Sequence, residues 1–239
     1  MMSVTGLGII SGLGLFALLG AAPIAQSKAQ SPGMSVRPAG LDSLCIDIHN
    51  TYECAQIIEK HQLSKPQLAR VVTRTPGGLR LRLLNGKTLA MQNREEGDSI
   101  RRFSFRDYPK GIGYFVLHRQ IYEGADYLLI HARSGKQFVL QERPVISPDG
   151  LRIVTASPGL SGMSSGNAVQ IWRIQPRGPE LEFELSPRDW EPSDPKWLGN
   201  RTIRLRQQAP HVGETRAFSK SVDLVRLQGK WRLQERSAP

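Results

Sequence analysis

The five residues Gly162–Gly166 form a Gly-x-Ser-x-Gly motif centred on Ser164. This pattern places a nucleophilic serine on a sharp strand-to-helix turn in α/β-hydrolases. Asp189 or Asp194 and then His211 follow in the hydrolase order of serine, acid and histidine. The segment after the motif predicts a strand instead of the required helix, so we interpret the motif as a Gly- and Ser-rich loop. A hydrolase that uses Ser164 or acidic loop residues stays as an alternative.

Two clusters of acidic residues also have the composition for chemistry. One spans Glu123–Asp126 and the other Asp189–Asp194. Paired carboxylates hydrolyse glycosides when they lie about 5–10 Å apart, and calcium takes roughly six or more oxygen ligands. We expect the first cluster at a hairpin turn and the second in a connection between groups of strands, where Trp190 packs. We therefore predict structural roles for both clusters.

The histidines give no metal-binding pattern. The five of them lack a His-x-x-x-His spacing, and the two cysteines do not form a Cys-x-x-Cys motif. We expect His118 and His131 on neighbouring strands, where they could pair with each other. We predict no metal, no cofactor and no catalytic residue.

Positive charge is the strongest functional signal. The chain of 239 residues has 32 Lys and Arg against 21 Asp and Glu, a formal net charge of +11. We expect three groups of arginines to project from strand faces or edges. They are Arg80 and Arg82, then Arg101, Arg102 and Arg106, then Arg201, Arg204 and Arg206. Clustered guanidinium groups bind phosphate and carboxylate bidentately, although a solvated outer face is the alternative interpretation.

The N-terminal segment predicts export. Residues 1–27 carry no charged side chain, and Gly6–Ala25 is an apolar run. Ser27 and Ala29 provide the small residues of a signal-peptide cleavage site. We predict a signal peptide over residues 1–29. Retention of the run as a membrane anchor is the alternative, because it is nearly long enough to span about 30 Å of hydrocarbon.

The two cysteines, Cys45 and Cys54, fit an exported protein. A closely spaced pair in an oxidising compartment predicts a disulfide, with two buried free thiols as the alternative. A capping pair that starts at Asn50 predicts a helix from Thr51 to Gln62. Cys54 would then lie in the first turn and Cys45 in the extended segment before it, where they can meet. We predict a linker over residues 30–40 and this disulfide-linked helix within residues 41–66.

The remaining residues, 67–239, predict β structure. Leu79–Leu83 and Ile203–Arg206 alternate strictly between apolar and arginine side chains, as half-buried strands do. Further expected strands are Tyr114–Arg119, Tyr127–Ala132, Gln137–Gln141, Leu151–Ala156, Val169–Ile174, Leu181–Leu185, Val222–Leu227 and Lys230–Gln234. Turn residues such as Asn85-Gly86 and Gln228-Gly229 separate them. Many short strands between such turns indicate an all-β fold.

One segment resembles a known repeat. Pro144–Ser157 contains a Ser-Pro-Asp-Gly turn and precedes Ala168–Ile174, which contains Ile-Trp. This resembles a blade of the WD-type and TolB-type β-propellers, and Asp194–Leu205 echoes its strand–turn–strand start at a spacing of roughly 40–50 residues. The chain also resembles small secreted bacterial proteins with a Cys-bearing helix ahead of blade-like strands. The resemblance implies a small or open propeller-like array of antiparallel four-stranded blades, with a β-sandwich as the alternative.

Together these patterns predict an exported, non-catalytic binding or protein-interaction module of the cell envelope, periplasmic or secreted. The expected partner is an envelope protein or an anionic polymer or surface, and not nucleic acid; a membrane is expected only if the N-terminal segment is uncleaved. A membrane-anchored envelope assembly factor is a further alternative. The candidate binding residues are Arg80, Arg82, Ser164, Asp189, Asp194, Arg204 and Arg206.

Overall fold

The N-terminal helix forms where the capping pattern predicts it. The computed structural model describes residues 40–159, 166–209 and 219–235, all within one unit, Arg37–Pro239. A 3-10 helix, η1 (Gly40–Cys45), precedes α1 (Thr51–Leu63) and the short α2 (Pro66–Ala69). Asn50 caps α1, since its Oδ1 accepts the N–H groups of Tyr52 and Glu53 at 2.9 and 3.1 Å. None of the described helices has the length and apolar character to cross a membrane.

A disulfide joins Cys45 to Cys54, as predicted, with 5.4 Å between their Cα atoms. It links the last residue of η1 to the first turn of α1, so Cys45 ends a 3-10 helix and does not lie in the extended segment that the sequence predicted. Pro66 does more than end the predicted helix, because it occupies the first position of α2, where its fixed φ angle and missing N–H are tolerated. The predicted signal peptide and most of the predicted linker lie outside the described residues.

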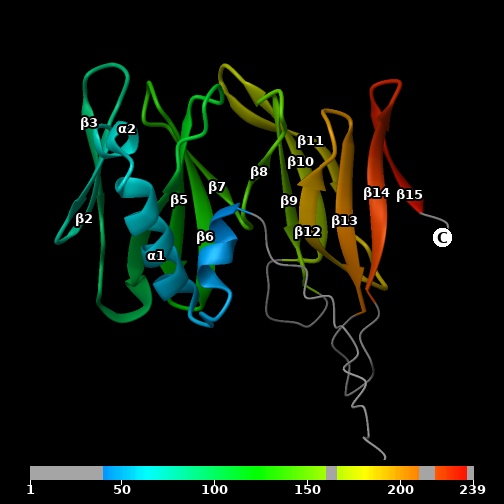
Figure 1. Cartoon of the computed structure of the whole chain (residues 1–239), viewed down its shortest axis with the longest axis horizontal. Coiled ribbons are helices and arrows are strands. Elements are labelled where there is room, and N and C mark those ends of the chain that lie inside the picture. The colour runs from blue at the N-terminus through cyan, green and yellow to red at the C-terminus, as the bar shows by residue number, and fades with distance from the viewer. Residues whose placement is uncertain (1–39, 160–165, 210–218, 236–239) are drawn as a thin grey trace, which may run out of the picture. The chain divides into compact units, whose positions relative to one another are not determined.

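Four antiparallel sheets follow, and within each sheet the strands pair in the order of the sequence (Figure 1). The first sheet holds β1 (Val72–Thr75), β2 (Gly78–Arg82) and β3 (Thr88–Gln92), and a 3-10 helix, η2 (Gly97–Ser99), leads to the second. The second holds β4 (Arg101–Asp107), β5 (Tyr114–Ile121), β6 (Gly124–His131) and β7 (Gln137–Leu140). The third holds β8 (Val145–Ile146), β9 (Arg152–Ser157), β10 (Ala168–Gln175) and β11 (Gly178–Leu185). The fourth holds β12 (Glu191–Trp197), β13 (Thr202–Gln208), β14 (Ser219–Leu227) and β15 (Lys230–Glu235).

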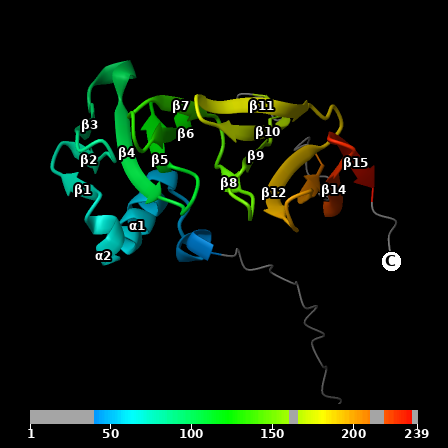
Figure 2. The same ribbon diagram turned by 90° about the horizontal axis from the view of Figure 1, so that it is seen from above.

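The sheets form the predicted open array of blades, and the described residues do not close into a barrel (Figures 1 and 2). The first blade has three strands rather than four. Apolar side chains that alternate along the strands fill the space between successive sheets. Leu81 and Leu117 belong to the core between the first and second sheets, and Ile171 and Leu224 to the core between the third and fourth. The two end sheets therefore each keep one face that no other described sheet covers.

The Ser-Pro-Asp-Gly turn is held by its own side chains. The Ser147 hydroxyl donates to Asp149 Oδ1 at 2.6 Å and accepts the Arg152 N–H at 2.9 Å. Although burial opposes ionisation, the hydrogen bonds from Ser147 and the Leu151 N–H lower the pKa of Asp149. The Asp149 N–H in turn donates to Asn200 Oδ1 at 3.1 Å, in the matching turn of the fourth sheet. The two similar strand–turn–strand segments are thus neighbours in space.

Two sequence interpretations need correction. His118 is opposite Tyr127 and His131 is opposite Tyr114, so the strand register keeps the two histidines from pairing. The segment Asp189–Asp194 is only partly a connection, because β12 begins at Glu191. Trp190 is buried in the core beside this strand, as expected.

Candidate functional site: a cationic groove on the first sheet

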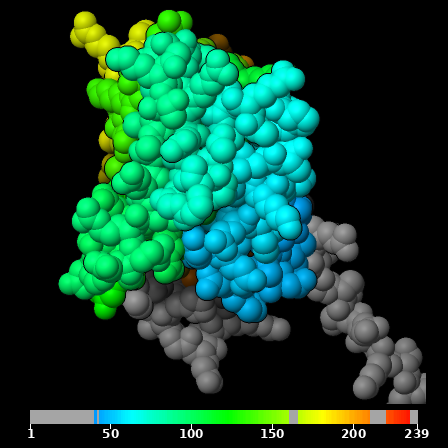
Figure 3. All heavy atoms as spheres, turned by 90° about the vertical axis from the view of Figure 1, so that its left-hand side faces the viewer, coloured from blue at the N-terminus to red at the C-terminus, as the bar shows by residue number. Residues whose placement is uncertain are grey.

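Arg80 and Arg82 lie on the uncovered face of the first sheet. Leu79 and Leu81 alternate with them along β2, and these leucines are buried against the second sheet while both arginines are exposed. The strict apolar–arginine alternation in the sequence therefore sorts the two kinds of side chain onto opposite faces. Figure 3 views the unit from the end at which this sheet lies.

The face around the two arginines carries no acidic side chain at the paired positions. Arg80 lies between Thr73 on β1 and Ala90 on β3, and Arg82 is opposite Thr88. These three neighbours are exposed as well. Within the described part of the chain, neither arginine takes part in an ion pair. Both guanidinium groups therefore offer all of their donors to solvent or to a partner.

A groove of about 260 Å³ lies beside Arg80, where the β1–β2 turn meets the end of β3. Its lining residues are Thr75, Gly77, Leu79, Arg80, Ala90, Met91, Gln92 and Asn93. This set includes one guanidinium and two side-chain amides but no carboxylate. Its electrostatic character is positive, which suits an anionic group.

Asn93 connects the end of β3 to the second sheet and to the β1–β2 turn. Its Oδ1 accepts the Phe103 N–H at 3.0 Å, which assigns the NH₂ group to the other side of the amide. The Asn93 backbone N–H donates to the Gly77 carbonyl at 2.8 Å and ties β3 to the β1–β2 turn. Gly78 allows this close approach: its φ is +146°, and a Cβ there would lie 2.0 Å from the Met91 carbonyl oxygen.

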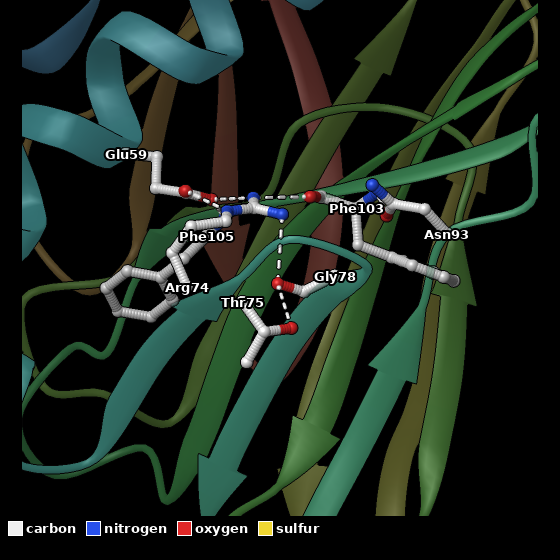
Figure 4. A network of polar contacts seen from close by, with 7 residues as sticks. All are labelled: Glu59, Arg74, Thr75, Gly78, Asn93, Phe103 and Phe105. Atoms are coloured by element: carbon white, nitrogen blue, oxygen red, sulfur yellow. Dashed lines mark hydrogen bonds and ion pairs between the residues drawn. The ribbon is translucent and has the colours of Figure 1, made fainter.

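An ion pair between Arg74 and the buried Glu59 supports the groove (Figure 4). Arg74 Nε donates to Glu59 Oε1 at 2.6 Å, and the same guanidinium donates to the carbonyls of Phe103 (2.7 Å) and Gly78 (3.1 Å). Glu59 is 6% exposed and also accepts the Phe105 N–H at 2.7 Å. The network joins α1, β1, β2 and β4, and it fixes Gly78 next to the groove.

Thr75 completes the support of the turn. Its hydroxyl donates to the Gly78 carbonyl at 3.2 Å, the same oxygen that Arg74 reaches. The charge of Arg74 is compensated by Glu59. Arg80 is therefore the cation of the groove that remains available.

The arginines of the fourth sheet are already paired. Arg204 makes a bidentate contact with Asp223 at 3.0 and 3.2 Å, and Arg206 lies 3.1 Å from Asp194. Asp194 has a φ of +47° and lies in the irregular part of β12 opposite β13. Two of the predicted candidates, Arg206 and Asp194, therefore contact each other, and Arg204 contacts Asp223. All of these contacts lie on the fourth sheet, away from Arg80 and Arg82.

The second arginine group, Arg101, Arg102 and Arg106, is divided among different environments, and Arg201 of the third group stands apart from Arg204 and Arg206. Arg102 pairs with Glu95 at 2.7 Å, whereas Arg101 and Arg201 are exposed. The Arg106 guanidinium lies over the Tyr127 ring at 5.9 Å, and burial lowers the pKa of Arg106. The three arginines of β4 therefore do not form one cationic patch.

The remaining predicted chemistry is not assembled by the described residues. Ser164 and His211 lie outside them, and Asp189 is exposed in the connection between β11 and β12. In the other acidic cluster, Glu123 is exposed, while Asp126 is buried and paired with Arg119. Among the described residues there is no group of three or more His, Cys, Asp or Glu side chains arranged to hold a metal ion.

His118 is a buried histidine of the second sheet. It is 5% exposed and packs edge-on against Tyr127, with 5.4 Å between ring centroids. Burial, together with the nearby positive charge of Arg106, lowers the pKa of His118 to about 4, against a smaller opposing effect of Asp126. The imidazole is therefore neutral at neutral pH.

A second, larger groove has mixed charge. It measures about 540 Å³ and is lined by Gln141, Gly166, Asn167, Ala168, Gln170, Glu184, Ser186, Pro187 and Arg188. The Asn167 amide is fully used in holding the walls, because it donates to the carbonyls of Pro187 and Trp190 at 2.8 Å each. Glu184 accepts from Gln170 at 3.0 Å. The lining of this groove contains one acid, Glu184, and one base, Arg188, so their charges oppose each other. The groove beside Arg80, in contrast, is lined by a base and no acid.

Sequence reasoning found Arg80 and Arg82 but missed Thr75, Gln92 and Asn93. The usable signal was the Thr75–Gly78 turn, whose two consecutive glycines indicate a close backbone approach. Nothing in the sequence indicates that Asn93 is the residue approached. No protein-family model matches the chain, and no curated protein matches it in sequence. Fold and site alone therefore define the class: an open array of antiparallel blades with a disulfide-linked helix and a cationic groove at one end.

Proposed function

We propose that this chain is an exported, non-catalytic binding module that recognises an anionic partner through the groove beside Arg80. The observation that carries the proposal is the pair of exposed, unpaired guanidinium groups on one strand face, next to a groove whose polar lining contains no carboxylate. A guanidinium fork binds phosphate or carboxylate bidentately, and Gln92 provides an amide in the lining of the groove.

Export is supported by the disulfide, because such bonds persist in oxidising compartments. The turn formed by Ser147 and Asp149 supports kinship with WD-type or TolB-type blades, since its side chains close the turn that joins the first two strands of that sheet. Rigid strands of this kind present turns and terminal strands to a partner without large rearrangement. Binding in place of catalysis follows from a site that offers donors and charge but no nucleophile or general base.

The test is a binding titration of the folded chain with a soluble polyanion, such as poly-L-glutamate or polyphosphate, at low and high salt. The double variant R80A/R82A is compared with R204A/R206A, which removes the same charge from arginines two residues apart on a strand of the other end sheet. We expect R80A/R82A to weaken binding at least tenfold, since each lost charge-assisted contact is worth about 1.5–3 kcal/mol, and R204A/R206A to leave it nearly unchanged. Equal losses in both variants would mean that net charge alone is recognised, and would overturn the proposal.

A further inference from the structure

The turns at one end of the strands form a surface that the proposed function does not use. From its cations and exposed leucines we infer that it binds the surface of an anionic phospholipid bilayer, with the leucines entering the bilayer and the cations contacting the headgroup phosphates. The groove beside Arg80 lies at the β1–β2 turn, at the opposite end of the strands. The inference therefore goes beyond the proposed function and does not depend on it.

These turns are held together in one row, which follows the upper edge of the sheets in Figure 1. The Leu84 N–H donates to the Ala132 carbonyl, and the Ala132 N–H donates to the Gly113 carbonyl, both at 2.8 Å. These two bonds join the β2–β3 turn, the β6–β7 turn and the β4–β5 connection. Gly150 of the β8–β9 turn lies beside Ile112 of that connection, since a Cβ at Gly150 would be 3.6 Å from the Ile112 side chain.

The row continues into the fourth sheet. The Asp149 N–H donates to Asn200 Oδ1 at 3.1 Å, which joins the β8–β9 turn to the β12–β13 turn. The Arg226 N–H, close to the β14–β15 turn, donates to the Arg201 carbonyl at 2.8 Å. We call the residues between strands at this end the turn rim, and they are 83–87, 108–113, 132–136, 147–151, 176–177, 198–201 and 228–229.

The charge of the turn rim is almost entirely positive. Its one acid is Asp149, and its six basic residues are Lys87, Lys110, Arg133, Lys136, Arg177 and Arg201. All six are exposed, and none of them is in an ion pair with another described residue. The described connections at the opposite end have the reverse balance, with six acids (Glu95, Glu96, Asp98, Glu123, Glu142, Asp189) and three bases (Arg94, Arg143, Arg188). Only the turn rim therefore complements an anionic surface.

The turn rim also exposes leucine side chains. Leu84, Leu151 and Leu198 are 60%, 55% and 50% exposed, and they belong to turns of the first, third and fourth sheets. A single exposed leucine is ordinary on a protein surface. Three of them, each in a turn of the same cationic row, provide separate apolar side chains between positive charges. This is the combination with which proteins bind at a membrane interface.

A bilayer uses both kinds of side chain, whereas a soluble polyanion uses only the cations. Interfacial binding scales with the apolar area that enters the bilayer and with the attraction to anionic lipids. Each Lys or Arg near such a surface contributes about fivefold in affinity. Because backbone hydrogen bonds fix neighbouring turns to one another, their contributions reach the same surface together. The leucines therefore favour an anionic bilayer over a soluble polymer as the partner of the turn rim.

The test measures cosedimentation of the full chain with vesicles of phosphatidylglycerol and phosphatidylcholine, and with vesicles of phosphatidylcholine alone. We expect at least tenfold tighter binding to the anionic vesicles at low salt, with the difference reduced at high salt because exposed charges are screened. The apolar run Gly6–Ala25 carries no charged side chain. Its own contribution is therefore measured by the phosphatidylcholine vesicles and is the same in every variant below.

Two pairs of arginines separate the turn rim from net charge. R133A/R201A removes exposed cations from two turns of the rim, whereas R94A/R188A removes exposed cations from the opposite end. Both variants change the net charge equally. We expect R133A/R201A to weaken binding to anionic vesicles at least tenfold, as two contacts of about fivefold each imply, and R94A/R188A to weaken it less than threefold. Equal losses would mean that the vesicles respond to net charge alone, and would overturn the inference.

The leucines give the sharper test. L84S/L198S keeps every charge and changes only exposed side chains, so it should fold normally, lose at least tenfold in affinity for anionic vesicles and bind polyphosphate unchanged. The matched control is Y122S, because Tyr122 is 60% exposed in the β5–β6 turn at the opposite end. An environment-sensitive fluorophore on Leu84→Cys should shift to shorter wavelength with anionic vesicles, and the same fluorophore on Tyr122→Cys should not. No shift at residue 84, or unchanged binding of L84S/L198S, would overturn the inference.

Arg80→Ala separates this inference from the proposed function. It should weaken binding of the soluble polyanion and leave vesicle binding within threefold of the native value. If Arg80→Ala has no effect on the polyanion while the turn-rim variants lose vesicle binding, the proposed function fails and this inference stands. If the polyanion needs Arg80 but anionic and neutral vesicles bind equally, the inference fails and the proposed function stands.

Discussion

The two ends of the array carry the same arginine pattern with opposite consequences. Arg80 and Arg82 on β2, like Arg204 and Arg206 on β13, are two residues apart on the uncovered face of an end sheet. On the fourth sheet Asp223 and Asp194 satisfy both guanidinium groups. On the first sheet the corresponding neighbours are threonine and alanine, so the charges stay uncompensated.

The difference shows that apolar–arginine alternation predicts which face of a sheet the arginines lie on, but not whether they bind a partner or pair with an acid of the same sheet. A paired arginine mainly stabilises its own sheet, and removing it leaves an acid without a partner. An unpaired arginine contributes little to folding and is available for binding. What decides between the two roles is whether a neighbouring strand brings an acid within reach of the arginine. The register places Asp223 opposite Arg204, whereas Arg206 is opposite serines and contacts Asp194 in the irregular part of β12.

The largest effect is expected where the groove is supported, because Glu59 is buried and accepts from both a guanidinium and a backbone N–H. Glu59→Ala leaves the Arg74 guanidinium and the Phe105 N–H without their acceptor. Loss of one partner of a buried pair costs 3–5 kcal/mol, and because Arg74 is 34% exposed we expect about 3 kcal/mol less stability against urea. Glu95→Ala removes an exposed partner of Arg102 and should cost no more than about 1 kcal/mol. Similar losses in both variants would contradict the supporting role of Glu59.

Acid should destabilise the middle of the array through His118. The pKa of His118 falls from the ordinary 6.5 to about 4 on folding. Between these values the unfolded chain binds the proton more readily, so the stabilising contribution is complete above pH 6.5 and is lost as the pH falls toward 4. This contribution amounts to about 3 kcal/mol. Urea denaturation of the native protein and of His118→Phe at pH 7 and pH 4 measures it, and parallel pH dependences would exclude His118 as the source.

Single substitutions at each end sharpen the comparison. We expect Arg80→Ala to reduce affinity for polyphosphate about tenfold, as expected for one charge-assisted contact. Its stability should change by no more than about 0.5 kcal/mol, because the side chain is exposed and unpaired. Binding titration and urea denaturation of the same preparation give both values. A clear loss of stability would mean that Arg80 has a structural role.

The smallest effect is expected for Arg204→Ala, which should lower stability slightly and leave binding unchanged. Arg204→Ala removes the bidentate partner of Asp223, whose side chain is 16% exposed. We expect a loss of about 1 kcal/mol in stability, consistent with a partly exposed pair, and unchanged affinity for polyphosphate. If Arg204→Ala weakened binding as much as Arg80→Ala, the distinction between the two ends would be lost.

Local patterns predicted much of this fold. Asn50 indicated where α1 begins, the spacing of Cys45 and Cys54 indicated the disulfide, and apolar–arginine alternation indicated β2 and β13. The short strand β8 has only two residues, too few to show a period. The pattern that predicts α1, β2 or β13 lies within the element itself, whereas β8 is too short to contain one.

The candidate site was only half predictable for a related reason. Arg80 and Arg82 were evident because their own strand shows the alternation. The contact between Asn93 and Gly77, and the pairing of Arg204 with Asp223, depend on the register between segments distant in sequence. Composition and periodicity carry no information about that register, so the sequence could not distinguish the free arginines from the paired ones.

Because the described strands of each sheet are consecutive in the sequence and pair in that order, the array has a consequence for how the protein folds. Each hairpin closes a short loop, so its entropic cost is small and its sheet can form without waiting for distant segments. Glu59 and Arg74 are different, because they need β4, about 30 to 45 residues downstream, before their contacts with Phe103 and Phe105 exist. We therefore expect the later sheets to form independently during folding, and the helix with the first sheet to become rigid only once β4 has formed.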